Sequence, residues 1–242
     1  SILIKVKKKV SINIINLGGK MFSKELNKKL DEYHLLNHPF YKSWNEGKLT
    51  REIIKDYAEQ YYQHVKAFPR YISATHSICE DIEKRKILLE NLQDEENKDG
   101  DHPKLWKNFA KALGADEKKI ENVKLDWFTK DMIDNFFSQA RKSYAEGLAS
   151  LYTYERQIPE IAETKIQGLK KFYGVKSKEG LEFFEAHKSA DVIHRAECEK
   201  LLDGLSKEEQ VKAEKASILT ARYLWNFLSG MTSKHKLDAI AA

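Results

Sequence analysis

The sequence contains few of the residues that interrupt helices. Four prolines and eleven glycines occur among 242 residues, so long stretches carry no residue that favours a turn. Within these stretches apolar residues recur at helical spacing, as in residues 22–35 and 178–203. We therefore expect an all-α protein built as a bundle of eight to ten helices.

Cysteines, long apolar runs and a charge of one sign are also scarce. The two cysteines, Cys79 and Cys198, fall inside helical patterns, which favours a reducing, cytoplasmic compartment without disulfides. No run of eighteen apolar residues occurs, so we expect no membrane span. The net charge of +5 comes largely from the first twenty residues, which is unlike the one-sided basic field of a nucleic-acid-binding protein.

Residues 1–20 have a different pattern from the rest of the chain. Their apolar residues alternate with Lys, Ser and Asn, which is the period of a strand, and a single strand has no partner in a helical protein. We expect residues 1–20 to be an extension outside the domain, with Met21 as the natural start. Residues 21–242 are then one helical bundle domain.

The apolar periodicity, together with residues that start or end helices, predicts ten helices after Met21. They are expected at residues 22–35, Phe40–Trp44, 51–67, Pro69–Cys79, 81–97, His102–Leu113, 129–157, 159–173, 178–203 and 207–230. Prolines mark several of the starts, and glycines follow several of the ends.

Polar residues interrupt an apolar stripe in the 178–203 helix. Spacings of three and four place on one face Phe184, His187, Asp191, His194, Cys198 and Leu201. The apolar members indicate that this face is buried, so His187, Asp191 and His194 stand where apolar residues are expected. They lie within about two turns and could share one or two metal ions. Alternatively, Asp191 orients two core histidines in a hydrogen-bonded network.

Two other segments place carboxylates on apolar faces. Glu155 follows Leu148 and Leu151 by seven and four residues, and a buried carboxylate must be neutralised, paired or metal-bound. A salt bridge from another helix would serve equally well. Either Glu95 or Glu96 shares a face with the leucines before it, because helical phase does not choose between them. His102 follows after a break, and a solvated acidic helix end is the alternative here.

Together the three segments offer three carboxylates and three histidines. Such a mixed oxygen and nitrogen set suits iron or manganese and usually activates dioxygen. The Glu-x-x-His pairs of ferritin-type bundles are missing. Further residues that could complete a redox pocket are Tyr41, Tyr57, Tyr61, Tyr62, Tyr154 and Lys165, although tyrosines at helical spacing are usually core residues.

Several segments resemble a known family. They are NHPFYKSWNEGKLT, DYAEQYYQHVKAFPRYISATHS, LLENLQDEEN, LYTYERQIPEIAETKIQGL and HKSADVIHR. They are similar to the family of the chlamydial protein associating with death domains (CADD), within the group that has the TenA and PqqC haem-oxygenase-like fold. The likeness extends from about residue 24 to about residue 230, and the residues beyond these limits show none.

The resemblance implies a haem-oxygenase-like bundle with a buried dinuclear site, often in a homodimer. The metals would be Fe/Fe or Fe/Mn, with dioxygen as co-substrate, and the implied ligands are Glu95, His102, Glu155, His187, Asp191 and His194. The family activity is synthesis of the folate precursor 4-aminobenzoate by a self-sacrificing route. It would correspond here to Tyr41 as the ring source, Tyr57 as its redox partner and Lys165 as the amino donor.

Other functions stay open at this point. The same site could serve a di-metal oxygenase acting on an external small molecule, which would need an apolar tunnel. The chain could instead be a host-directed effector that binds death-domain proteins, although no motif for such binding is visible. A TenA-type hydrolase would use a cysteine nucleophile, and PqqC-type oxidation would leave the buried carboxylates without a purpose.

Overall fold

The computed structural model describes residues 21–237, except for the side chains of residues 189–193. The predicted strand-like extension at residues 1–20 lies outside the described residues. Within residues 21–237 every regular element is helical. The elements are α1 (Phe22–Leu30), η1 (Asp31–Tyr33), η2 (Leu35–Asn37), α2 (Pro39–Asn45), α3 (Arg51–Ser77), α4 (Ile82–Glu95), α5 (His102–Ala112), α6 (Glu117–Asn122), α7 (Trp127–Lys142), α8 (Tyr144–Glu155), α9 (Ile158–Lys171), α10 (Lys178–Asp203) and α11 (Lys207–Lys234).

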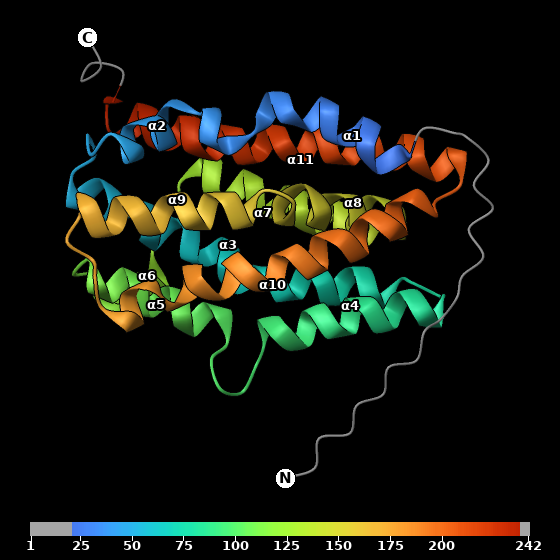
Figure 1. Cartoon of the computed structure of the whole chain (residues 1–242), viewed down its shortest axis with the longest axis horizontal. Coiled ribbons are helices and arrows are strands. Elements are labelled where there is room, and N and C mark those ends of the chain that lie inside the picture. The colour runs from blue at the N-terminus through green and yellow to red at the C-terminus, as the bar shows by residue number, and fades with distance from the viewer. Residues whose placement is uncertain (1–20, 238–242) are drawn as a thin grey trace.

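Most of the long helices run roughly along the longest axis of the molecule (Figure 1). The helix α3 packs against α4, α5, α7 and α8, whereas α11 covers α7 and α8 from the other side. The helix α10 crosses the bundle obliquely and contacts α5, α8 and α9 (Figure 1). This oblique path brings the middle of α10 beside the end of α4 and the start of α5.

Side-chain caps set the helix starts that matter for the site. The Asp101 carboxylate accepts a hydrogen bond from the backbone N–H of Lys104 at 2.8 Å and so begins α5 at His102. The side chain of Ser177 caps α10 in the same way, through the N–H of Gly180. These caps fix the phase of two helices that carry the predicted ligands.

The predicted helix boundary at Pro69 is wrong. Proline lacks the N–H that would bond to the carbonyl of Val65, yet α3 continues through it to Ser77. Residues on both sides of the proline are buried, among them Phe68, Tyr71 and Ile72. Apolar burial along the whole helix outweighs the one hydrogen bond that the proline removes.

The single helix predicted at 129–157 is also wrong, because it is divided at Ser143. Ser143 has extended backbone angles and accepts a hydrogen bond from the N–H of Glu146, which begins α8. The spacing of Ser143 and Glu146 is that of a capping box, a signal that the apolar periodicity concealed. The short helix α6 was not predicted; Asp116 caps it at the N–H of Lys119.

None of the described helices combines the length and apolar character needed to cross a membrane.

Candidate metal centre

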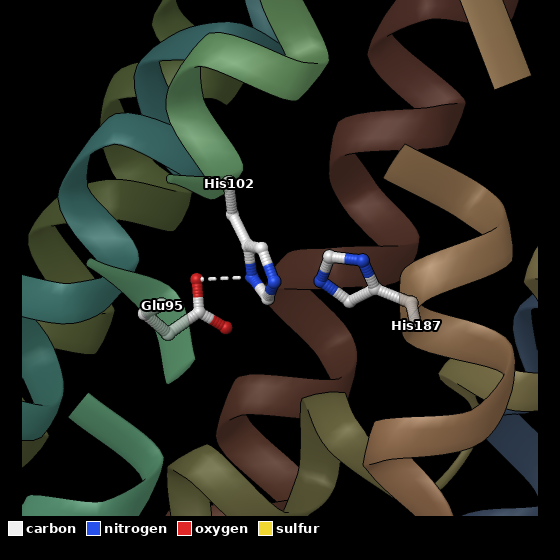
Figure 2. A group of neighbouring side chains, drawn as sticks. All are labelled: Glu95, His102 and His187. Atoms are coloured by element: carbon white, nitrogen blue, oxygen red, sulfur yellow. Dashed lines mark ion pairs between the residues drawn. The ribbon is translucent and has the colours of Figure 1, made fainter. Parts of the chain in front are cut away.

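The predicted ligands lie where several helix ends approach α10. Glu95 is the last residue of α4, His102 is the first residue of α5 and Glu155 is the last residue of α8. His187 and His194 belong to α10. Figure 2 shows Glu95, His102 and His187 pointing toward one another from three helices. Residues separated by more than ninety positions in the sequence thus converge on one point.

Glu95, His102 and His187 form a compact and buried group. One possible ligand atom from each lies within 4.8 Å of the other two. The three side chains are almost inaccessible, with exposed fractions of 5%, 6% and 4%. Glu96, the alternative to Glu95 in the sequence, is exposed at the C-terminus of α4.

The contact between Glu95 and His102 is close but not directed as a hydrogen bond. Glu95 Oε2 and His102 Nδ1 are 2.7 Å apart (Figure 2), whereas Nδ1 has no partner of hydrogen-bond geometry among the described residues. Burial is the largest single influence on the pKa of His102 and lowers it, but the acidic groups around it, Glu95 foremost, together leave the pKa above its ordinary value. Two ligand atoms that both point at one metal position would lie close together without forming a hydrogen bond.

His187 is held in the form that binds a metal. Its Nδ1 lies 2.7 Å from the backbone carbonyl oxygen of Phe183, one turn earlier in α10. Donation of the Nδ1 proton to this carbonyl leaves the lone pair on Nε2, the usual arrangement around metal-binding histidines. Burial lowers the pKa of His187 well below its ordinary value, so the ring is neutral at pH 7.

Glu155 lies at the edge of this group and is only 2% exposed. Asn91 Nδ2 donates a hydrogen bond to Glu155 Oε1 at 2.7 Å, and Cys198 Sγ lies 3.8 Å from Oε2. Burial raises the pKa of Glu155 to about 7, and the nearby Glu95 also raises it, although His194 and Asn91 act in the opposite direction. Among the described residues, the contacts of Glu155 offset only part of the cost of burying its charge.

His194 has a partner that the sequence did not indicate. Its Nε2 lies 3.0 Å from Asp94 Oδ2, and the Asp94 side chain is about half exposed. The predicted ligand Asp191 belongs to the segment whose side chains lie outside the described residues. The structure therefore brings together three of the six predicted ligands and places Glu155 and His194 near them, while the ligand assignment itself stays a prediction.

The donor set fits a cation. Neutral imidazole and carboxylate together suit iron and manganese, and a buried group with a nitrogen that lacks a hydrogen bond is unusual in a folded protein unless something else binds it. Of the outer residues, Asn91 could have been recognised from the sequence. It precedes Glu95 by four positions and so lies on the same buried face of α4.

A second polar group, fully buried, lies between α2, α3 and α9. Lys165 Nζ is 2.6 Å from Tyr57 Oη, and Tyr57 Oη is 2.9 Å from Tyr41 Oη. The amine lies 5.0–5.5 Å from the ring centroids of Tyr41, Tyr57, Tyr61, Trp106 and Phe184. The three residues that the resemblance implied, Tyr41, Tyr57 and Lys165, thus form one hydrogen-bonded row.

Burial controls the protonation of this row. It lowers the pKa of Lys165 to about 7, so the amine is partly neutral at physiological pH. It also raises the pKa values of Tyr41 and Tyr57 well above the ordinary value. Both phenols therefore keep their protons, and the amine is the group able to receive one. Of the other candidate tyrosines, Tyr61 and Tyr154 line the space between the row and His187, whereas Tyr62 lines a surface pocket.

A small cavity separates the two groups. It measures about 10 Å³ and is lined by Tyr61, Trp106, Tyr154, Ile158, Ile161, Ala162, Lys165, Phe183, Phe184 and His187. This space is about the size of one water molecule. Drug-sized ligands occupy pockets of roughly 300–1,000 Å³, so the described side chains leave no room for a free organic substrate here.

Known proteins resemble this chain over most of its length. Residues 24–234 match the TENA/THI-4/PQQC family. A 4-aminobenzoate synthase from Chlamydia muridarum is 40% identical over 222 residues, which cover 91% of this chain and 91% of that protein.

Two solved structures share the fold. A CADD-like protein of unknown function from Nostoc punctiforme has a TM-score of 0.71 and 15% identity, over 89% of this chain and 99% of its own. A domain with a haem-oxygenase-like fold from Shewanella denitrificans has a TM-score of 0.74 and 16% identity, over 90% and 94%. The predicted all-α, haem-oxygenase-like fold and the family resemblance are confirmed, and the chain belongs to the TENA/THI-4/PQQC family.

Proposed function

We propose that this protein is an oxygen-dependent 4-aminobenzoate synthase that takes the aromatic ring from its own Tyr41. The observation that carries the proposal is the buried row of Tyr41, Tyr57 and Lys165, closed off beside the Glu95–His102–His187 group. The ring donor and the amine are both side chains of the protein. The 40% identity to a 4-aminobenzoate synthase supports the same activity.

The metal site in this proposal contains two ions, Fe/Fe or Fe/Mn. Glu95, His102 and His187 would hold them together with Glu155, Asp191 and His194. When bound, the ions would activate dioxygen and supply the oxidising power that a phenol requires. The neutral state of His187 favours binding of a cation at this place, and a bound cation would stabilise the charged form of Glu155, whose pKa burial raises to about 7.

The protein's own residues handle the proton. A phenol that loses an electron becomes strongly acidic, and the neutral Lys165 amine, 2.6 Å from Tyr57, can take the proton that Tyr57 releases. Tyr57 can then receive hydrogen from Tyr41 across their 2.9 Å contact. A neutral amine also has the lone pair required of an amino donor, the role proposed for Lys165.

The small size of the cavity argues against an external organic substrate. An oxygenase acting on a free small molecule needs an apolar tunnel or pocket beside the metals. The space between His187 and Lys165 is about 10 Å³ and holds a diatomic molecule or a water. Homodimer formation, a cytoplasmic location and binding of host death-domain proteins concern features outside this site, and they stay predictions.

Isotope labelling tests the proposed activity. Protein expressed with ring-labelled tyrosine is loaded anaerobically with Fe(II), with or without Mn(II), and then exposed to reductant and oxygen. The expected result is labelled 4-aminobenzoate in the small-molecule fraction, absent from Tyr41→Phe and His187→Ala. Tyr62→Phe is the matched control and keeps the product, because Tyr62 lines a surface pocket with Lys104 and Lys107. Oxygen uptake without labelled product would contradict the proposal.

A further inference from the structure

The aromatic side chains between the two buried groups form a continuous path. The His187 ring centroid lies 4.0 Å from that of Phe183, which lies 4.8 Å from that of Trp106. Trp106 in turn lies 6.0 Å from Tyr57 and 5.0 Å from Tyr61, and Tyr61 stacks on Tyr57 at 5.3 Å. Trp106 therefore lies between the candidate metal centre and the tyrosine row.

Tyr41 itself contacts a different set of rings. Its neighbours are Phe40, Trp44 and Tyr57, with centroid distances of 5.8, 6.3 and 6.5 Å. Of these three neighbours, Tyr57 is the one that also contacts Trp106, so the path of ring contacts from Tyr41 toward the metal centre leads through Tyr57 and then Trp106. Because electron transfer slows steeply with distance, two short steps through an oxidisable ring are faster than one long step.

Trp106 has the chemistry that such a step requires. An indole gives up an electron far more readily than the phenyl rings of Phe183 and Phe184 beside it. The Trp106 side chain is fully buried, and its Nε1–H donates to the carbonyl oxygen of Ala58 at 2.8 Å. An amide carbonyl is a weak base, so an oxidised indole would retain its proton. Trp106 could then pass an electron without passing a proton.

We propose that Trp106 relays electrons from Tyr57 to the metal centre, an inference that rests on the proposed function. The indole of Trp106 gives one electron to the one-electron oxidant that dioxygen provides at the centre. Tyr57 returns one electron to the indole and passes its phenolic proton to the Lys165 amine. Tyr41 then transfers one electron and one proton to Tyr57. Overall Tyr41 is oxidised by one electron, Lys165 gains the proton and the oxidant is reduced.

The chain offers a matched control for this relay in Trp44. Like Trp106, Trp44 is fully buried and lies 6.0 Å from the Tyr57 ring centroid. Its other aromatic neighbours are Tyr41 and Tyr173, however, rather than Phe183. Replacing either tryptophan by phenylalanine removes one indole beside Tyr57, but only Trp106→Phe interrupts the path to His187.

Freeze-quench electron paramagnetic resonance tests the relay through a spectroscopic signature. Anaerobic, metal-loaded protein is mixed with oxygen, and the tyrosyl radical signal is followed in the wild type, Trp106→Phe, Trp106→Tyr and Trp44→Phe. Metal content and thermal unfolding are measured on each to verify the site and the fold. In Trp106→Phe we expect the radical to form at least about tenfold more slowly, equivalent to a barrier increase of about 1.4 kcal/mol or more. Trp106→Tyr recovers much of the rate because phenol is oxidisable, and Trp44→Phe resembles the wild type.

The outcomes separate the relay from the proposed function. If metal-loaded Trp106→Phe forms the radical at the wild-type rate, the relay is overturned, whereas the synthase proposal is not affected. Equal loss in Trp106→Phe and Trp106→Tyr would also overturn it, since packing rather than redox chemistry would then be at fault. A Trp106-dependent radical without labelled 4-aminobenzoate would support the relay and contradict the synthase. A wild type that forms no tyrosyl radical would overturn both.

Discussion

The two buried polar groups of this protein differ in the charges that surround them. In the Tyr41–Tyr57–Lys165 row burial acts with little opposition, and it lowers the pKa of Lys165 to about 7. In the metal centre burial lowers the pKa of His187, whereas for His102 the surrounding acidic groups, Glu95 foremost, together outweigh burial and raise the pKa. The first group thereby contains an amine that can accept a proton, whereas the second combines carboxylates with imidazoles, a donor set that suits a cation. The difference shows that neighbouring charge, as well as burial, sets the pKa of a buried polar group.

The largest expected effect comes from removing a central ligand of the metal centre. His187→Ala deletes the imidazole whose orientation is fixed by the Phe183 carbonyl. We expect metal affinity to fall by more than the roughly 10–100-fold that loss of an outer partner costs. Titration of metal-free protein with Fe(II) or Mn(II) under anaerobic conditions measures the change. If the folded variant takes up metal as the wild type does, His187 is not a metal ligand.

Removal of the buried amine should affect stability with a clear pH dependence. The folded pKa of Lys165, about 7, lies below its ordinary value of 10.5. The resulting destabilisation is therefore fully present below pH 7 and disappears as the pH rises toward 10.5. We expect Lys165→Met to raise the free energy of unfolding by about 2–4 kcal/mol at pH 6, allowing for its lost hydrogen bond, and by much less at pH 10.

Chemical denaturation at the two pH values measures this difference, on metal-free protein. Lys170→Met is the control, because Lys170 lies on the same helix with its side chain half exposed and only a 3.9 Å ion pair to Glu185. Its replacement should change stability by less than about 1 kcal/mol. A Lys165→Met variant that is no more stable than the wild type at pH 6 would show that the amine remains charged and solvated.

A smaller effect is expected at the residue that orients Glu155. Asn91→Leu removes the donor of the 2.7 Å hydrogen bond to Glu155 Oε1 but keeps the volume and burial of the side chain. We expect metal affinity to fall by about 10-fold, the lower end of the range for outer partners. The same anaerobic titration gives the value, and an affinity equal to that of the wild type would mean that Asn91 only fills space.

The smallest effect is expected at Asp94, the half-exposed partner of His194, in contrast to Asn91, the buried partner of Glu155. Asp94 lies 3.0 Å from His194 Nε2, yet its side chain is about half exposed. Solvent screens such a pair, so Asp94→Asn should change the free energy of unfolding by about 1 kcal/mol or less. Equilibrium unfolding checks this value. A loss as large as that expected for a buried pair would place Asp94 within the metal site itself.

The sequence predicted the helical bundle because apolar periodicity is a direct consequence of burial. The errors arose where local and tertiary signals compete. Pro69 normally ends a helix, but the buried faces on both sides keep α3 continuous. Ser143 breaks an apolar pattern that has no glycine or proline at that point, and only its capping contact with Glu146 reveals the boundary.

The candidate site was predictable in part for a similar reason. His187, His194 and Glu155 interrupt apolar faces, and all three are buried in the structure. Helical phase could not separate Glu95 from Glu96, because each stands at helical spacing from leucines earlier in α4. Tyr41 and Lys165 were proposed from the family resemblance. Their contacts with Tyr57 join α2, α3 and α9. Contacts between different helices cannot be predicted from residue spacing within one helix.

Peptide mapping of the protein before and after one exposure to oxygen tests the central claim most directly. The account predicts that the peptide containing Tyr41 loses the mass of its phenol ring, in proportion to the 4-aminobenzoate released. The peptide containing Tyr62 should remain intact, as should the Tyr41 peptide in His187→Ala. Release of 4-aminobenzoate from protein whose Tyr41 peptide is unchanged would contradict the account, because the ring would then come from another source.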